Sequence, residues 1–201
     1  MKRSLFLWVT VPILLIALMC ILLFIPPSPL GIWISGISYI ANHTDEYDYF
    51  STSLDDVVEF SIDFKNLDSN IGKTIYEKDG CKIEIYDIEK TTDNYIVYFK
   101  SYGTYSKKSA TLISGVKHSR TNNNSFVYNC CALLQVKHED GLYDCSVSGV
   151  SGLNHKSGDI FGYYVFHNEN PLRQKSYEIS GIDGAIFCMS GLVKNEWMIK
   201  K

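Results

Sequence analysis

The sequence lacks an excess of positive charge. Its 201 residues include 19 Lys and Arg against 22 Asp and Glu, which gives a net charge of −3. One stretch without acidic residues carries five bases, but it has no stacked aromatic motif and its composition is typical of a solvated loop region. These bases are Lys100, Lys107, Lys108, Lys117 and Arg120. The charge therefore indicates no nucleic-acid partner.

The sequence also lacks the short, regular spacings that bind metals or perform catalysis. It has six cysteines but no Cys-x-x-Cys pair, and the nearest approach to a zinc motif is Cys130-Cys131 with His138. The run from Ser148 to Gly152 reads SGVSG, which is not the Gly-x-Ser-x-Gly elbow of a serine hydrolase. We assign no catalytic, cofactor-binding or metal-binding residue and expect no cofactor.

Charged residues are absent from Ser4 to Ile25, a run of about 22 residues, and a bilayer core needs about 20 apolar helical residues. The run is longer than the apolar part of a cleaved signal peptide, and no small-x-small site follows it. Met19 precedes Cys20, where a lipoprotein signal would place a small residue. The pattern predicts an uncleaved signal anchor that forms a single transmembrane helix.

The charges around this run predict its orientation in the membrane. Lys2 and Arg3 precede it, whereas the first charge after it is Asp45 and the first base after it is Lys65. Because basic residues stay on the cytoplasmic side, we expect a cytoplasmic N-terminus and an extracytoplasmic body, with the lipid bilayer as a partner of the N-terminal helix. The expected divisions are a cytoplasmic tip and anchor at 1–29, a membrane-proximal segment at 30–44 and an extracytoplasmic β domain at 45–201.

The membrane-proximal segment follows a cluster of prolines at 26, 27 and 29, which ends the predicted helix. Leu30 to Ala41 is apolar but too short to span a membrane. Trp33, Ile37 and Ile40 recur at helical spacing, which is typical of a helix lying in the membrane interface with its tryptophan at headgroup depth. A first strand or an edge of the domain core is an equally supported alternative.

The remainder of the chain has the two-residue period of β-strands. Apolar and polar side chains alternate from Val58 to Phe64, inside an otherwise acidic stretch from Asp45 to Asp68 that we interpret as a solvated face. Ser53 and Asp56 could instead begin a short helix. Further strand-like runs are separated by turn residues: Thr74–Glu77, Cys81–Ile88, Tyr95–Tyr102, Ala110–Lys117, Phe126–His138, Tyr143–Val150, Ile160–Phe166, Ser176–Ile182 and Ala185–Val193.

About nine strands without helical periods between them predict an all-β fold, an antiparallel sandwich or barrel. The stretch Ser157 to Phe166, SGDIFGYYVF, resembles a strand of small immunoglobulin-like domains in bacterial surface proteins, with Ser157 in place of a proline. The hairpin from Lys82 to Tyr102 is similar to the opening hairpin of those domains, and the similarity extends to about Val193. It implies an immunoglobulin-like sandwich with a binding or structural role at the cell envelope and no chemistry.

Five cysteines follow the predicted anchor, at positions Cys81, Cys130, Cys131, Cys145 and Cys188. One or two disulfides and a set of buried thiols are both compatible with the sequence, and the odd number leaves at least one thiol unpaired unless chains cross-link. Adjacent strand residues face opposite sides. We therefore expect one of Cys130 and Cys131 to face the interior, beside Leu133, and the other to be exposed and reactive.

The alternative to a binding module is a sortase-like cysteine transpeptidase. Members of that family are similar in size, N-terminal anchor and all-β character, and here Cys188 could be activated by His118 or His138. Two departures count against it. Gly184 to Phe187 stands in place of the family's Thr-Leu-x-Thr, and no arginine follows Cys188, the last being Arg173. We therefore expect a protein that is not an enzyme, with a protein or cell-envelope partner.

Overall fold

The computed structural model describes residues 11–19, 21, 23, 25–92, 94–120, 126–138, 141–165 and 183–201. Of the predicted anchor, residues 4–10, 20, 22 and 24 lie outside this description, and residues 11–19 are helical with exposed apolar side chains. None of the described helices has both the length and the apolar content needed to cross a bilayer. The predicted membrane-spanning helix is therefore not found among these residues.

The fold is predominantly β, as the alternating patterns predicted. The described part of the chain forms fifteen strands rather than about nine, in four antiparallel sheets. The strands are β1 (Tyr47–Ser53), β2 (Val58–Asp63), β3 (Thr74–Lys78), β4 (Cys81–Lys90), β5 (Tyr95–Tyr102), β6 (Thr104–Tyr105), β7 (Ser109–Ser114), β8 (Val116–Arg120), β9 (Phe126–Cys130), β10 (Leu133–His138), β11 (Gly141–Asp144), β12 (Ser146–Val150), β13 (Ile160–Val165), β14 (Gly184–Ser190) and β15 (Val193–Ile199).

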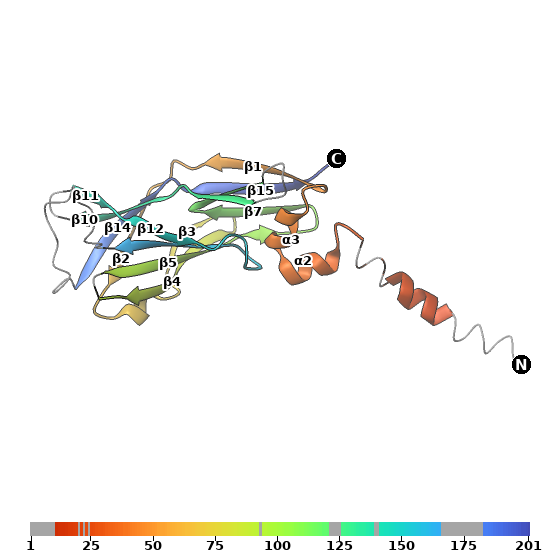
Figure 1. Ribbon diagram of the computed structural model, residues 1–201, viewed down its shortest axis with the longest axis horizontal. Coiled ribbons are helices and arrows are strands. Elements are labelled where there is room, and N and C mark those ends of the chain that lie inside the picture. Colours follow the sequence, from red (N-terminus) through yellow and green to blue (C-terminus); the bar gives the residue numbers. More distant parts are fainter. Residues whose placement is uncertain are drawn as a thin grey trace, which may run out of the picture.

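Two of the sheets follow each other along the molecule (Figure 1). One has the strand order β1-β15-β7-β6 and the other β11-β10-β14-β2. They are linked by consecutive strands, because β15 follows β14 after a break of two residues, while β1 pairs with β15 and β2 with β14. The third sheet, β12-β13-β5-β4-β3, packs against them, and β8 and β9 form a separate hairpin. The result is an elongated two-layer body.

The main core lies between these layers and is rich in aromatic rings. Phe99 of β5 lies 5.7 Å, ring centre to ring centre, from Phe60 of β2 and 5.5 Å from Phe161 of β13. Phe60 in turn stacks on Phe187 of β14 at 5.7 Å. These separations are the preferred ones for aromatic pairs, which add about 0.5–1.5 kcal/mol each to the gain from burial. The rings therefore join two strands of one layer, β5 and β13, to two of the other, β2 and β14.

The membrane-proximal segment forms two short helices, α2 (Pro29–Ser35) and α3 (Ile37–Asn42), which meet at Gly36. The predicted stripe is wrong, because Ile37 and Ile40 are fully buried while Trp33 is 70% exposed. The two isoleucines belong to a second core beside the first sheet, with Tyr47, Leu112, Leu153 and Trp197. The segment is thus helical and also forms an edge of the domain core.

Several predicted strands are divided or lie elsewhere. The runs Ala110–Lys117, Phe126–His138 and Tyr143–Val150 each break into two strands, at Gly115, Cys131–Ala132 and Cys145. Gly115 lies at the break between β7 and β8. A side chain at this position would lie 2.6 Å from Phe161, so the close approach of the chain requires glycine. The acidic stretch contains β1, which was not predicted, and no helix begins at Ser53. Its acidic side chains are exposed or partly exposed, as expected of a solvated face. The predicted strand Ser176–Ile182 lies outside the described residues.

Candidate functional site

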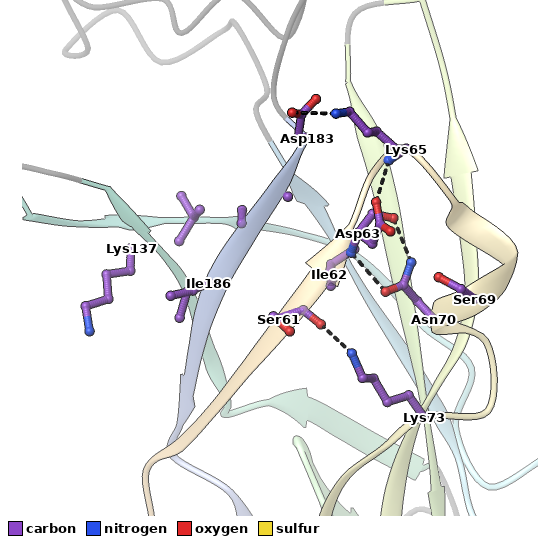
Figure 2. Close-up of a pocket in the computed structure, with 13 residues that line it drawn as sticks. Ser61, Ile62, Asp63, Lys65, Ser69, Asn70, Lys73, Lys137, Asp183 and Ile186 are labelled. Carbon is purple, nitrogen blue, oxygen red and sulfur yellow. Dashed lines mark hydrogen bonds and ion pairs between the residues drawn. The ribbon is translucent and has the colours of Figure 1, made fainter.

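A pocket of about 1010 Å³, shown from close by in Figure 2, opens beside the start of β14. This end of the molecule lies away from α2 and α3 (Figure 1). The pocket is formed where β2 ends, β14 begins and β10 ends, together with the short 3-10 helix Leu67–Asn70. Its volume is at the upper end of the range for ligand pockets. The lining residues are Ser61, Ile62, Asp63, Lys65, Ser69, Asn70, Lys73, Val136, Lys137, Asp183, Gly184, Ala185 and Ile186.

Asn70 holds one wall of this pocket in place. Its side-chain oxygen accepts a hydrogen bond from the backbone N–H of Asp63 at 2.9 Å, and its Nδ2 donates to the carbonyl of Asp63 at 2.8 Å. A neighbouring strand would bond to the edge of β2 in the same way. Because Asn70 is 1% exposed, these bonds are protected from water, and the turn after β2 is closed against its own strand.

The charged side chains of the pocket are three lysines and two aspartates. Lys65 pairs with Asp183 at 2.5 Å, but both side chains are about two-thirds exposed, so the pair is weak. Lys73 Nζ donates to the carbonyl of Ser61 at 3.0 Å rather than to a carboxylate.

Lys137 reaches out of the pocket to Glu59 at 3.3 Å, and both side chains are more than half exposed. Lys73 and Lys137 are thus cations on the rim that lack a strong, buried partner. The lining as a whole carries a positive excess, which favours a ligand with anionic groups.

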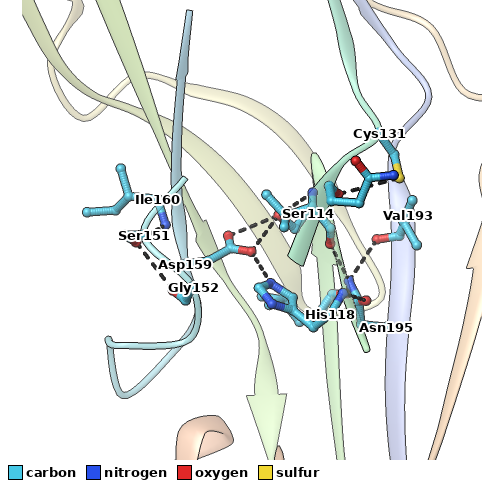
Figure 3. A network of polar contacts seen from close by, with 12 residues as sticks. Ser114, His118, Cys131, Ser151, Gly152, Asp159, Ile160, Val193 and Asn195 are labelled. Carbon is cyan, nitrogen blue, oxygen red and sulfur yellow. Dashed lines mark hydrogen bonds and ion pairs between the residues drawn. The ribbon is translucent and has the colours of Figure 1, made fainter. Parts of the chain in front are cut away.

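A second polar cluster is buried at the junction of the layers (Figure 3). The carboxylate of Asp159, which is 0% exposed, accepts hydrogen bonds from Ser114 Oγ at 2.9 and 2.8 Å. It also lies 2.5 Å from Nε2 of His118, whose side chain is 2% exposed. A buried polar group is stable only when it is hydrogen-bonded, and the Asp159 carboxyl group has two such partners, Ser114 and His118.

Asn195 extends this network to the first sheet. Its Oδ1 accepts hydrogen bonds from the His118 backbone N–H at 3.1 Å and from the Tyr49 hydroxyl at 2.8 Å. Its Nδ2 donates to the carbonyl of Val116 at 3.0 Å. Burial raises the pKa of Tyr49 to about 12, so its hydroxyl stays protonated and remains a donor.

The order of groups in this network is not that of a catalytic triad. In a triad the imidazole lies between the nucleophile and the carboxylate and takes the proton from the nucleophile. Here the carboxylate of Asp159 lies between the hydroxyl and the imidazole, so Ser114 gives its hydrogen bond to the carboxylate. The arrangement joins β7, β8, β15 and the loop before β13.

The residues of the sortase-like alternative do not come together among the described side chains. Cys188 is half-buried on β14, and its Sγ lies 3.9 Å from Oε2 of Glu59. His118 is engaged by Asp159, and the side chain of His138 lies outside the described residues. In the sheet Cys188 pairs with Gln135, three positions from His138 and hence roughly 10 Å along the strand.

No disulfide joins the five cysteines that follow the predicted anchor, all of which lie in the described part of the chain. As predicted, Cys130 and Cys131 differ in exposure, since Cys130 is half-buried and Cys131 exposed. Burial raises the pKa of the Cys130 thiol. The prediction that Leu133 faces the interior beside the buried cysteine is wrong, because Leu133 is 39% exposed and Leu134 is the buried one.

Within the described ranges, no three His, Cys, Asp or Glu side chains gather as a metal site requires. Searches with family models, curated proteins and solved structures gave no match. The sequence missed Ser114, Asp159 and Asn195, which have no motif in common and meet only through the fold. The function is therefore inferred from the sequence pattern and the geometry of the pocket.

Proposed function

We propose that the chain is a membrane-tethered extracytoplasmic β-sandwich module, of the immunoglobulin-like kind, with a non-enzymatic binding role at the cell envelope. Residues 1–29 form the cytoplasmic tip and anchor, 30–44 the membrane-proximal segment and 45–201 the β domain. The uncharged run from Ser4 to Ile25 and the bases that precede it support the anchor. The exposed apolar side chains of the helical residues 11–19 are of the kind that lipid would cover.

The pocket is the contact site for the partner in this proposal, and its positive excess is the observation that carries it. Figure 2 shows Lys73 and Lys137 on either side of Ile186, which is 41% exposed. An apolar side chain between two cations suits a partner that presents acidic groups around an apolar contact, because opposite charges give specificity and faster association.

A protease accessibility experiment tests the tether. Protease added outside intact cells is expected to digest the body, because the charge asymmetry places it outside. A cytoplasmic protein serves as the control for cell integrity. Protection of the stretch from Phe126 to Val193 would contradict the proposed orientation.

A charge-reversal experiment tests the pocket. A fluorescent hexaglutamate peptide serves as a probe for anionic chemistry, with the full-length protein in detergent. The double variant Lys73→Glu, Lys137→Glu is expected to abolish binding. The matched control Lys107→Glu, Lys108→Glu alters the net charge equally at exposed positions of the other end and is expected to retain it. Equal loss in both variants, or no binding by the unmodified protein, would contradict a pocket for anionic groups.

A further inference from the structure

Helix α2 has apolar side chains on two faces. Ile32 is 7% exposed and packs into the second core, whereas Trp33 and Ile34 point outward and are 70% and 58% exposed. The Nζ of Lys156 lies 5.3 Å from the centre of the Trp33 ring. A tryptophan with a lysine over its ring and an isoleucine beside it is the combination found at membrane interfaces. The outward face therefore fits the headgroup region of a bilayer.

The two helices are fixed to the body rather than loosely tethered. The backbone N–H of Ile37 donates to the carbonyl of Lys156 at 3.0 Å. Gly36 has a positive φ of 55°, and a side chain there would lie 2.1 Å from the same carbonyl oxygen. Ile37 and Ile40 are fully buried. The direction in which Trp33 points is thus set by the body.

Other exposed groups surround the helices at this end of the molecule (Figure 1). The turn before β7 lies here, because the Tyr47 hydroxyl donates to the carbonyl of Lys107 at 2.8 Å and the Ile199 N–H to that of Lys108 at 2.9 Å. The side chains of both lysines are exposed, and Met198 is 52% exposed. Apolar and basic groups thus share one end of the body.

We propose that this membrane-facing end, made of Trp33, Ile34, Lys107, Lys108 and Lys156, lies in the headgroup region of the bilayer and holds the β body upright. The proposal rests on the anchor proposed above, which would place the bilayer a few residues before α2. The end becomes a second contact between the protein and its membrane, in addition to the anchor.

Apolar insertion rather than anionic charge drives this contact. Asp45, Glu46 and Asp48 lie at the same end, where the Lys200 N–H donates to the carbonyl of Glu46 at 2.8 Å and Lys200 Nζ lies 3.9 Å from Asp48. These carboxylates offset much of the attraction of the lysines, Lys200 included, for anionic lipid. The partner is accordingly a zwitterionic bilayer surface, and binding of the end should depend little on salt.

The proposal also locates the pocket. Gly184 lines the pocket, and the chain then runs through β14 and β15 to Ile199 at the membrane-facing end. At 3.3 Å per residue this path is roughly 45 to 50 Å long, allowing for the break between the strands. An upright body therefore presents the pocket roughly that far from the bilayer.

Tryptophan quenching in vesicles tests the contact. The full chain carrying Trp8→Phe retains Trp33 and Trp197, and Trp197 is buried at 3% exposure. In phosphatidylcholine vesicles with bromine near the headgroups, the emission of Trp33 is expected to be quenched. The further variant Trp33→Phe reports Trp197 alone, which is expected to be unaffected. Quenching of Trp33 by aqueous acrylamide and not by bromolipid would overturn the proposal.

Energy transfer to labelled lipid tests the orientation. A fluorescent amino acid at position 107 is expected to transfer strongly to a headgroup acceptor, and one at position 186 weakly. Trp33→Ser with Ile34→Ser is expected to make the two signals more alike, because the body can then tilt. The matched control Phe50→Ser changes an aromatic side chain that is 55% exposed on β1 and is expected to leave both signals unchanged.

Flotation with the vesicles distinguishes this proposal from the one on which it rests. A chain that does not float lacks the proposed anchor. A chain that floats with equal transfer from both positions has the anchor but not the upright body.

Discussion

A chain that begins at Asp45 is expected to be far less stable than one that begins at Pro26. The sequence alone places the start of the β domain near Asp45, but α2 and α3 cover the second core of the body. Removing them exposes the faces of four side chains that are at most 8% exposed in the structure: Tyr47, Leu112, Leu153 and Trp197.

The size of the effect follows from these four side chains. Full burial of a large apolar side chain stabilises the folded state by about 1.5–3 kcal/mol. If the helices supply about half of the cover, their removal costs about 3–6 kcal/mol. The burial of Ile37 and Ile40 themselves adds less, because ordering the segment costs conformational entropy that the shorter chain does not lose. A domain with about 5–15 kcal/mol of total stability would lose a large part of it.

Urea unfolding of the two chains, followed by the fluorescence of Trp197, measures this difference. The chain from Pro26 is expected to unfold cooperatively, and the chain from Asp45 at a much lower midpoint or without a cooperative transition. If the shorter chain does not fold at all, Ile40→Ala in the longer one is expected to cost about 2–5 kcal/mol. Ile34→Ala, at a position that is 58% exposed, is the control and should change little. Equal midpoints for the two chains would refute the assignment of the helices to the core.

Three further outcomes are expected. Asp159→Ala should lower stability by about 1–3 kcal/mol in urea unfolding, because it leaves the buried Ser114 hydroxyl and His118 imidazole without their hydrogen-bond partner, whereas Asp183→Ala removes only an exposed pair and should change little. Iodoacetamide should label Cys131 faster than Cys130 in the native protein, and equal rates by mass spectrometry would contradict their difference in burial. Hydrogen bonds from a lysine and a tyrosine lower the pKa of Asp56, so its contribution to stability is present above the usual carboxyl pKa of about 4 and lost as the pH falls through the lowered pKa. The destabilisation by Asp56→Asn should therefore shrink below that pH, and a constant effect would contradict this.

The strands that the sequence predicted best are those with two different faces. In β2, Ile62 is buried and Glu59 exposed, and the alternation extends along the strand. The strand β5 has the predicted bounds, Tyr95–Tyr102, because inward and outward residues alternate over its whole length. A two-residue period is visible in the sequence wherever one face meets the core and the other meets water.

The sequence did not predict the breaks within continuous strand-like stretches. At these breaks the chain stops pairing with one strand and begins to pair with another. Phe126 to His138 reads as a single strand, yet β9 pairs with β8 and β10 with β14. The backbone N–H groups of Cys131 and Ala132 both donate to the carbonyl of Gly115, which separates the two strands. This partner lies in another part of the chain, so no local pattern can indicate the break.

The buried network gives a reason for such breaks to occur at fixed places. Ser114 ends β7, pairs with Val193 of β15, and donates to the carboxylate of Asp159. A slip of β7 by one residue would turn the Ser114 hydroxyl to the other face of the sheet and leave a buried carboxylate without that donor. This cost adds to that of turning Leu112, which is fully buried, away from the core. We infer that the network selects one alignment of β7, β15 and the loop before β13, and so fixes the surface on which α2 and α3 pack.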